Sequence, residues 1–100
     1  PKFLHVGPGY GGSCFPKDTR AFARTGRDHG APLRLTEAVI DVNERVKARM
    51  VAKVAALCDD RLAGRTVAVL GVTFKPNTDD MREAPSLTIV PALVGAGARV

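Results

Sequence analysis

The sequence is 100 residues long, is 45% hydrophobic and carries a formal net charge of +5. That length suits one small domain or parts of two, and the hydrophobic content excludes a disordered chain. The basic residues are spread out, with no Lys/Arg block and no interleaved aromatic residues, so no nucleic-acid partner is expected. No signal peptide or long apolar run occurs, which favours a cytoplasmic protein with reduced cysteines and no membrane partner.

The chain opens with a glycine-rich loop that leads into a helix. Residues 3–13 contain four glycines and show no periodicity, which predicts a loop. A helix is expected from about Phe15, with Ser13 as its N-cap and Asp18 in its first turn. Gly30, followed closely by a proline, is expected to end this helix.

A cysteine, Cys14, stands where the loop meets the helix. Unpaired backbone N–H groups and the positive end of the helix macrodipole favour the thiolate, which is the nucleophilic form of cysteine. Lys17 and Asp18 add a cation and a carboxylate close behind it. The residues alone leave two interpretations open. We favour a reactive nucleophile, and the alternative is a small buried side chain, which most free cysteines are. Cys58 is expected to pack in the core.

A long amphipathic helix is predicted over residues 32–58, because apolar residues recur at steps of three or four. The apolar stripe consists of Leu35, Val39, Val42, Val46, Met50, Val54 and Leu57. The polar face consists of Glu37, Asp41, Glu44, Arg45, Lys47 and Lys53. Since this helix is longer than usual, three interpretations stay open: one face of an ordinary core, a spine between two domains, or a surface packed on another chain.

The last third of the chain alternates between strand and helix patterns. Residues 66–72 form a continuous apolar run, which is typical of a strand buried on both faces of a parallel sheet. A polar loop follows over residues 73–80, and helix signals return from about Ala84, with Pro91 expected to kink or split that helix. Residues 99–100 are expected to begin the next strand.

The predicted fold class is α/β overall. A mainly helical central region over residues 1–62 precedes the first β-loop-α of a Rossmann-like, doubly wound domain over residues 63–100. Ligands of such sheets bind at the carboxyl end of a strand, which is here at residues 74–77. For Lys75 and Arg82 the residues alone leave the choice open between a ligand contact and a solvated or salt-bridged side chain.

Two segments, residues 3–18 and 69–86, resemble the UDP-glucose 6-dehydrogenase family in its bacterial form. This resemblance implies an NAD-dependent enzyme that oxidises UDP-glucose to UDP-glucuronate by two hydride transfers through a cysteine thioester. Phe3-Leu4 and Tyr10 favour UDP-glucose as the substrate. Dehydrogenases of GDP-mannose or UDP-N-acetylmannosamine are the alternatives within the enzyme class.

The resemblance also implies a role for each matched residue. Cys14 is matched to the nucleophile, and Asp18 to the aspartate that assists proton transfer through water. Lys17 and Arg82 are matched to residues that contact NAD. The residues matched to substrate binding are Phe3, Leu4, His5, Val6, Gly7, Tyr10, Gly11, Phe74 and Lys75.

We expect these 100 residues to be a piece of a longer enzyme. The chain begins at Pro1 rather than Met and contains no GxGxxG motif, so the NAD-binding domain is expected outside it. The piece alone is expected to be inactive. The family's central helix supports a homodimer, with which the apolar stripe agrees. A non-catalytic dimerisation module is the alternative from another functional class.

Overall fold

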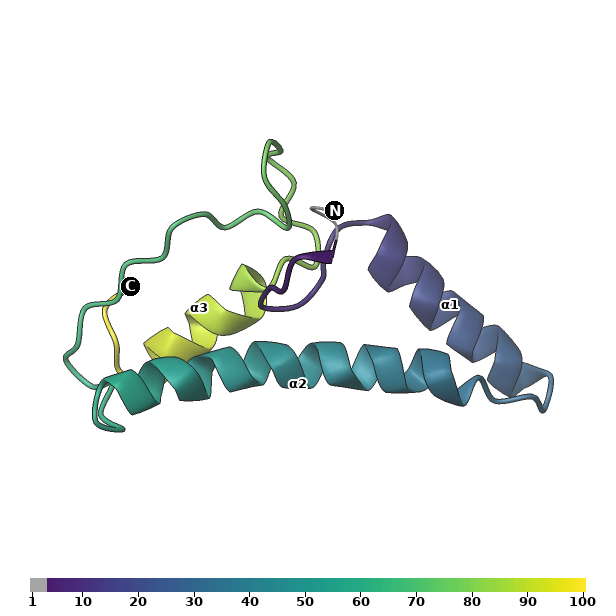
Figure 1. Ribbon diagram of the computed structural model, residues 1–100, viewed down its shortest axis with the longest axis horizontal. Coiled ribbons are helices and arrows are strands. Elements are labelled where there is room, and N and C mark those ends of the chain that lie inside the picture. The colour runs from purple at the N-terminus through teal and green to yellow at the C-terminus, as the bar shows by residue number, and fades with distance from the viewer. Residues whose placement is uncertain (1–3) are drawn as a thin grey trace.

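The computed structural model describes residues 4–100 and contains three helices. These are α1 (Cys14–Asp28), α2 (Arg34–Leu57) and α3 (Ser86–Gly95). The long helix α2 extends along most of the molecule, with α1 angled away from its N-terminal end and α3 lying along its C-terminal half (Figure 1). The radius of gyration is 15.8 Å, against about 13 Å for a compact domain of this length. The chain is therefore elongated and leaves parts of its helices uncovered.

Helix α1 begins at Cys14, one residue before the predicted start. Ser13 occupies the N-cap position, as predicted, but its side chain makes no capping hydrogen bond there. The prediction of an acidic residue in the first turn was wrong, because Asp18 is the fifth residue of the helix and the first turn contains none. The sulfur of Cys14 therefore lies at the very start of the helix, without a competing carboxylate in the same turn.

Helix α1 ends in a Schellman motif, as the glycine at position 30 predicted. Gly30 has a φ of +67°, and its N–H donates to the carbonyl of Arg27 at 3.0 Å. The N–H of Ala31 donates to the carbonyl of Gly26 at 2.8 Å. A Cβ at Gly26 would lie 2.7 Å from the Ala31 oxygen and 2.8 Å from Cγ of Leu33. The glycine at position 26 thus permits the tight turn into α2.

Helix α2 confirms the predicted long helix, but its apolar stripe is covered only in part. Leu35 is 86% exposed, and Val39 and Val42 are about half exposed. Val54 packs against the core beside α3, but Leu57 at the end of the stripe is 87% exposed, contrary to the prediction. The prediction was wrong for one residue of the polar face. Lys47 is only 3% exposed, because the glycine loop packs over its methylene chain.

The hydrophobic core is small and lies between the C-terminal half of α2 and α3. Its buried members are Leu62, Leu93 and Ala98. The partly buried residues packed against them are Val51, Val54, Ala55, Cys58, Val67 and Ile89. Cys58 therefore packs in the core, as predicted. Among the described residues, no helix is both long enough and apolar enough to cross a lipid bilayer.

The predicted strand over residues 66–72 is not formed. Among residues 4–100 the structure contains one isolated parallel β-bridge, between Thr66 and Arg99. The N–H of Val67 donates to the carbonyl of Arg99, and the N–H of Arg99 donates to the carbonyl of Arg65, each at 2.8 Å. A strand needs a neighbouring strand for its ladder of hydrogen bonds, and no described segment pairs with residues 68–72. Leu70 is consequently 96% exposed rather than buried.

Helix α3 was predicted correctly in position and continues through Pro91 as one element. It too ends in a Schellman motif, in which Gly97 has a φ of +90° and the N–H of Ala98 donates to the carbonyl of Leu93 at 3.1 Å. The helical part of the predicted fold class is therefore confirmed, whereas the start of a Rossmann-like sheet is not.

Candidate functional site

The glycine-rich loop packs tightly against the segment between α2 and α3. The N–H of Gly12 donates to the carbonyl of Arg82 at 2.7 Å. A Cβ at Gly12 would lie 2.9 Å from the ring of Phe74, and a Cβ at Gly11 would lie 2.8 Å from the carbonyl carbon of Glu83. Real side chains are not found at such distances, so both glycines are required for this contact. Parts of the chain that are about 70 residues apart in sequence meet here.

Asn43 of α2 holds the other side of the same loop. The N–H of Tyr10 donates to Oδ1 of Asn43 at 2.7 Å, and Nδ2 of Asn43 donates to the carbonyl of Tyr10 at 3.3 Å. Asn43 is 7% exposed and lies directly under Gly9, whose Cβ would come within 2.8 Å of Oδ1. The ring of Tyr10 packs edge-on against Phe15, with 4.6 Å between the ring centroids.

An ion pair joins α1 to the segment before α3. The guanidinium of Arg20 donates to both carboxylate oxygens of Glu83, at 2.9 and 3.0 Å. This bidentate pair, with a smaller contribution from the cation of Lys47, holds the pKa of Glu83 below its ordinary value. Glu83 also has a φ of +54°, so its backbone conformation is unusual for a residue with a side chain. The pair therefore secures a turn that the backbone alone does not favour.

Cys14 is exposed at the start of α1, and the preceding Ser13 lines a pocket together with Lys17 and Arg82. Its sulfur lies 3.6 Å from Oγ of Ser13. The neighbouring Asp18, at 2.6 Å, raises the pKa of Lys17, and the charge of a Cys14 thiolate raises it further. Asp80 raises the pKa of Arg82, again with a smaller contribution from Cys14. Lys17 and Arg82 therefore both lie within electrostatic range of the sulfur.

Arg82 forms a close ion pair with Asp80. Its Nε and Nη2 atoms, and its backbone N–H, donate to the carboxylate of Asp80 at 2.7 to 3.1 Å. These bonds lower the pKa of Asp80 to about 2. The salt bridge that we left open for Arg82 is therefore present. Its guanidinium is still largely exposed, so the pair orients the cation without burying it.

The two residues matched to NAD contacts line one pocket. This pocket of about 480 Å³ is formed by Gly12, Ser13, Lys17, Arg20, Arg82 and Glu83. Three of its six lining residues are cationic, one is anionic and the glycine loop supplies the rest. The arrangement suits a ligand that carries negative charge, such as a phosphate group.

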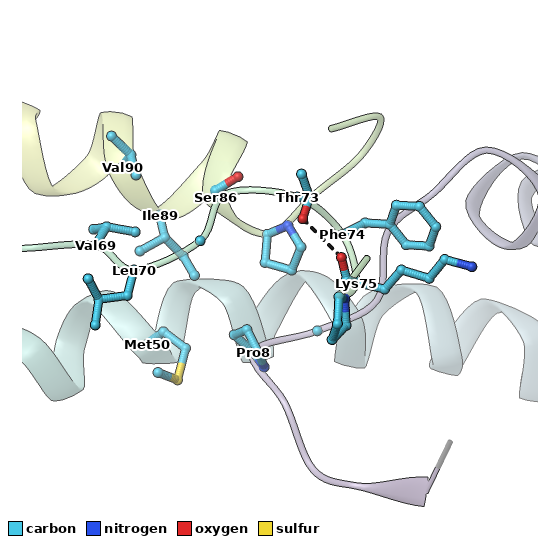
Figure 2. Close-up of a pocket in the computed structure, with 14 residues that line it drawn as sticks. Pro8, Met50, Val69, Leu70, Thr73, Phe74, Lys75, Ser86, Ile89 and Val90 are labelled. Atoms are coloured by element: carbon cyan, nitrogen blue, oxygen red, sulfur yellow. Dashed lines mark hydrogen bonds between the residues drawn. The ribbon is translucent and has the colours of Figure 1, made fainter. Parts of the chain in front are cut away.

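A second pocket, of about 490 Å³, lies where the carboxyl end of the predicted strand was expected to bind ligands. Figure 2 shows Phe74 and Lys75 at one end of it, Met50 and Leu70 at the other end, and Pro8 of the glycine loop between them in this view. The ammonium of Lys75 lies 5.2 Å from the ring centroid of Phe74, and the hydroxyl of Thr73 donates to the carbonyl of Lys75 at 2.9 Å. The pocket therefore combines apolar walls with one cation, which is the usual composition of a small-molecule site.

The structure does not bring all the predicted substrate residues together. Leu4, His5 and Val6 are exposed and line neither of these pockets. Gly7 and Tyr10 line a third pocket, against the uncovered N-terminal half of α2. Phe3 lies outside the described residues.

Sequence reasoning missed Asn43, Arg20 and Glu83 as parts of the site. Of these three, only Asn43 could have been noticed from the sequence. Asparagine is unfavourable in the interior of a helix, so it occurs there mainly where its side chain makes a specific contact. Arg20 and Glu83 resembled ordinary surface charges, and nothing in the sequence linked them. Their pairing depends on how α1 folds back toward the segment before α3.

Two domains of one protein family match the chain. Residues 1–45 match the central domain of the UDP-glucose/GDP-mannose dehydrogenase family, and residues 68–100 match the UDP-binding domain of the same family. Together these matches include the glycine-rich loop, the first half of the long helix and the Phe74-Lys75 segment.

Curated relatives align over nearly the whole chain. The UDP-glucose 6-dehydrogenase of Rhizobium meliloti is 57% identical over 99% of this chain, and that of Bacillus subtilis, TuaD, is 48% identical over 99%. The chain spans 23% and 21% of the length of these two relatives. It is therefore similar to less than a quarter of each.

Solved structures agree with the arrangement of the helices. A UDP-glucose dehydrogenase from the archaeon Pyrobaculum islandicum matches 94% of this chain and 22% of its own, with a TM-score of 0.84 and 46% identity. A GDP-mannose dehydrogenase from Pseudomonas aeruginosa, in a ternary complex, matches 97% of this chain and 21% of its own, with a TM-score of 0.78 and 28% identity. With both domain matches in their proper order, the chain belongs to the UDP-glucose/GDP-mannose dehydrogenase family.

Proposed function

We propose that this chain forms part of an NAD-dependent UDP-glucose 6-dehydrogenase, which converts UDP-glucose to UDP-glucuronate with Cys14 as the nucleophile. The observation that carries the proposal is the environment of Cys14. The exposed sulfur lies at the start of α1, and it interacts electrostatically with Lys17 and Arg82, which reach it from two separate segments. An exposed sulfur at the start of a helix, next to a pocket lined by two cations, is accessible to a substrate that carries negative charge.

The cysteine would act in the second half of the reaction. Loss of a hydride and a proton from the C6 alcohol gives an aldehyde, and the thiolate of Cys14 attacks its carbonyl carbon to form a hemithioacetal. Loss of a second hydride gives a thioester. Water then cleaves the carbon–sulfur bond, which releases the carboxylate and regenerates the thiol. Asp18, exposed and next to Lys17, is suited to exchange protons with water during these steps.

The cofactor would be NAD, which supplies the hydride acceptor for both oxidations. The residues of this chain that fit it are Lys17 and Arg82, because both are cations on the pocket beside the glycine loop. The Asp80 carboxylate restrains the direction of the Arg82 side chain by accepting hydrogen bonds from Nε and Nη2 of the guanidinium. We infer that this restraint orders the guanidinium before a phosphate binds.

The substrate would use the pocket that contains Phe74 and Lys75. Lys75 offers a cation to a phosphate of the sugar nucleotide, while Phe74 supplies an apolar wall and packs on Gly12. Gly11 and Gly12 bring the backbone of the loop next to this segment. Residues 3–7 and Tyr10 would complete the sugar-nucleotide site.

The rest of the proposal concerns assembly. We propose a boundary between a central domain over residues 1–62 and a UDP-binding domain over residues 63–100. The uncovered half of the α2 stripe is suited to pack on a second copy, which gives a homodimer in the cytoplasm. The NAD-binding domain would belong to the remaining length of the enzyme, so these 100 residues alone would not turn over substrate.

Replacing the nucleophile tests the proposal. In the full-length protein, Cys14→Ser should abolish formation of UDP-glucuronate from UDP-glucose and NAD, because a serine hydroxyl is a far weaker nucleophile than a thiolate at neutral pH. The matched control is Cys58→Ser, which should retain turnover because Cys58 packs in the core. Product formation is measured by chromatography.

Three results would contradict parts of the proposal. Full turnover by the Cys14→Ser protein would exclude Cys14 as the nucleophile. Faster turnover of GDP-mannose or UDP-N-acetylmannosamine than of UDP-glucose would change the substrate. A full-length protein that binds neither NAD nor any sugar nucleotide would favour a dimerisation module without activity.

A further inference from the structure

We propose that Asn43 is a positioning residue that holds the glycine-rich loop, and through it Cys14, in the geometry needed for attack on the substrate. This inference rests on the proposed function of Cys14. Asn43 lies on α2, on a different element from Cys14, and it has no place among the residues matched to catalysis or binding.

The first argument is the geometry of the amide. The side chain of Asn43 makes both hydrogen bonds that a neighbouring β-strand would offer to Tyr10, one to the N–H at 2.7 Å and one to the carbonyl at 3.3 Å. A loop in the middle of the site has no backbone partner for these groups, and buried unpaired groups are costly. Among the side chains of similar shape, only an amide provides an acceptor and a donor in this arrangement without a charge.

The second argument is that the loop is held from two sides. Asn43 fixes it at Tyr10, and the Arg82 carbonyl fixes it at Gly12. Cys14 is only two residues beyond Gly12 and begins α1. The contact between the rings of Tyr10 and Phe15 links the clamped loop directly to the residue after Cys14.

The third argument is the rigidity of the support. Asn43 is near the middle of the 24-residue helix α2 and is 7% exposed, with Gly9 packed directly on Oδ1. Its side chain therefore has little room to move. A displacement of a reacting group by about 1 Å can reduce a rate by about a hundredfold, so loss of this clamp should affect the chemical step.

The experiment uses graded variants of the full-length protein. Asn43→Ala removes both hydrogen bonds, whereas Asn43→Asp keeps the shape and the acceptor for the Tyr10 N–H but loses the donor. We expect kcat to fall by about tenfold to a hundredfold in Asn43→Ala and by a smaller factor in Asn43→Asp. The KM for UDP-glucose should change less than kcat in both. If Asn43→Ala fails to fold, Asn43→Asp carries the comparison.

A structural control separates positioning from general destabilisation. Val54 is on the same helix and packs on the core, away from the loop. Val54→Ala should lower the melting temperature but leave kcat unchanged at temperatures well below the transition. Hydrogen exchange of the Tyr10 amide, measured by mass spectrometry on residues 9–13, should be faster in Asn43→Ala and unchanged in Val54→Ala.

The outcomes are distinguishable from those that test the nucleophile. Wild-type kcat in both Asn43 variants, with Cys14→Ser inactive, would overturn this inference and leave the proposed function intact. An equal loss of kcat in Val54→Ala and Asn43→Ala would show that Asn43 only stabilises the fold, which also overturns it. Full turnover by Cys14→Ser would instead contradict the proposed function, while faster exchange at Tyr10 would still support the clamp.

Discussion

The surroundings of Cys14 come from two separate parts of the chain. The helix start supplies N–H groups, Lys17 follows on α1, and Arg82 reaches the same place from the segment before α3. Asp80 holds Arg82 in position. At the scale of single residues, the site is therefore a set of oriented charges around an exposed sulfur, and each charge has a partner that limits its movement.

The pair formed by Asp80 and Arg82 should have a measurable pH dependence. In the folded chain the pKa of Asp80 is about 2, below its ordinary value of 3.8. The ion pair therefore stabilises the fold at any pH above the pKa that Asp80 has in the unfolded chain. This stabilisation is lost as the pH falls from about 4 through about 2, because the carboxylate becomes protonated. An NMR titration that follows the carboxyl-carbon chemical shift of Asp80 against pH should have its midpoint near pH 2.

Removal of the partner provides the comparison. In Arg82→Ala the midpoint of the Asp80 titration should move up toward 3.8, because the bonds from Arg82 are the largest cause of the lowered pKa. An Asp80 carboxyl that titrates at the same pH in both proteins would contradict the ion pair.

At the scale of elements, the three helices share one way of ending. After each helix, a residue with positive φ precedes an N–H that donates back into the helix. In α1 and α3 this residue is a glycine within a complete Schellman motif, whereas in α2 it is Asp59, with a φ of +54°. The N–H of Asp60 donates to the carbonyl of Ala55 at 2.9 Å, which is one of the two hydrogen bonds of a Schellman motif. A residue with a Cβ is strained in this conformation.

Glycine at this position should therefore be stabilising. Asp59→Gly is expected to raise the free energy of unfolding by about 0.5 to 1 kcal/mol, because it relieves the left-handed strain at a modest cost in chain entropy. The matched control is Asp41→Gly in the interior of α2, which should lower the free energy of unfolding by about 0.5 to 1 kcal/mol. Urea unfolding measures both, and the same sign of change in the two variants would contradict the motif.

At the scale of the whole molecule, the uncovered half of α2 is the main unexplained surface. Leu35, Val39 and Val42 are apolar and exposed, next to Gly7 and Tyr10 of the glycine loop. Exposed apolar residues in a row are typical of an interface. If a second copy covers this surface, the dimer contact would adjoin the loop that leads to Cys14.

A charge on this surface tests the proposed homodimer. In the full-length protein, Leu35→Asp should weaken self-association by at least about tenfold, because burying an unpaired carboxylate in an apolar contact is unfavourable. The matched control is Lys53→Asp on the exposed polar face, which should leave association unchanged. Analytical ultracentrifugation over a range of concentrations measures both, and an unchanged dimer of the Leu35→Asp protein would locate the interface elsewhere.

The sequence by itself determined the three helices and the place of Cys14. Apolar spacing over residues 32–58 predicted α2, and the glycine at 30 marked the end of α1, because these signals are local and depend on a few neighbouring residues. The resemblance of residues 3–18 and 69–86 to a known family identified the family itself, which the domain matches confirmed.

Only the tertiary structure decided which residues surround the loop. The sequence indicated a buried strand over residues 66–72, but a strand depends on a partner that no described segment provides. Likewise Asn43, Arg20 and Glu83 looked like ordinary polar residues of a helix face or a loop. Their roles follow from contacts between residues 33 to 63 positions apart, and such contacts come from the packing of α1, α2 and the segment before α3 rather than from any local pattern.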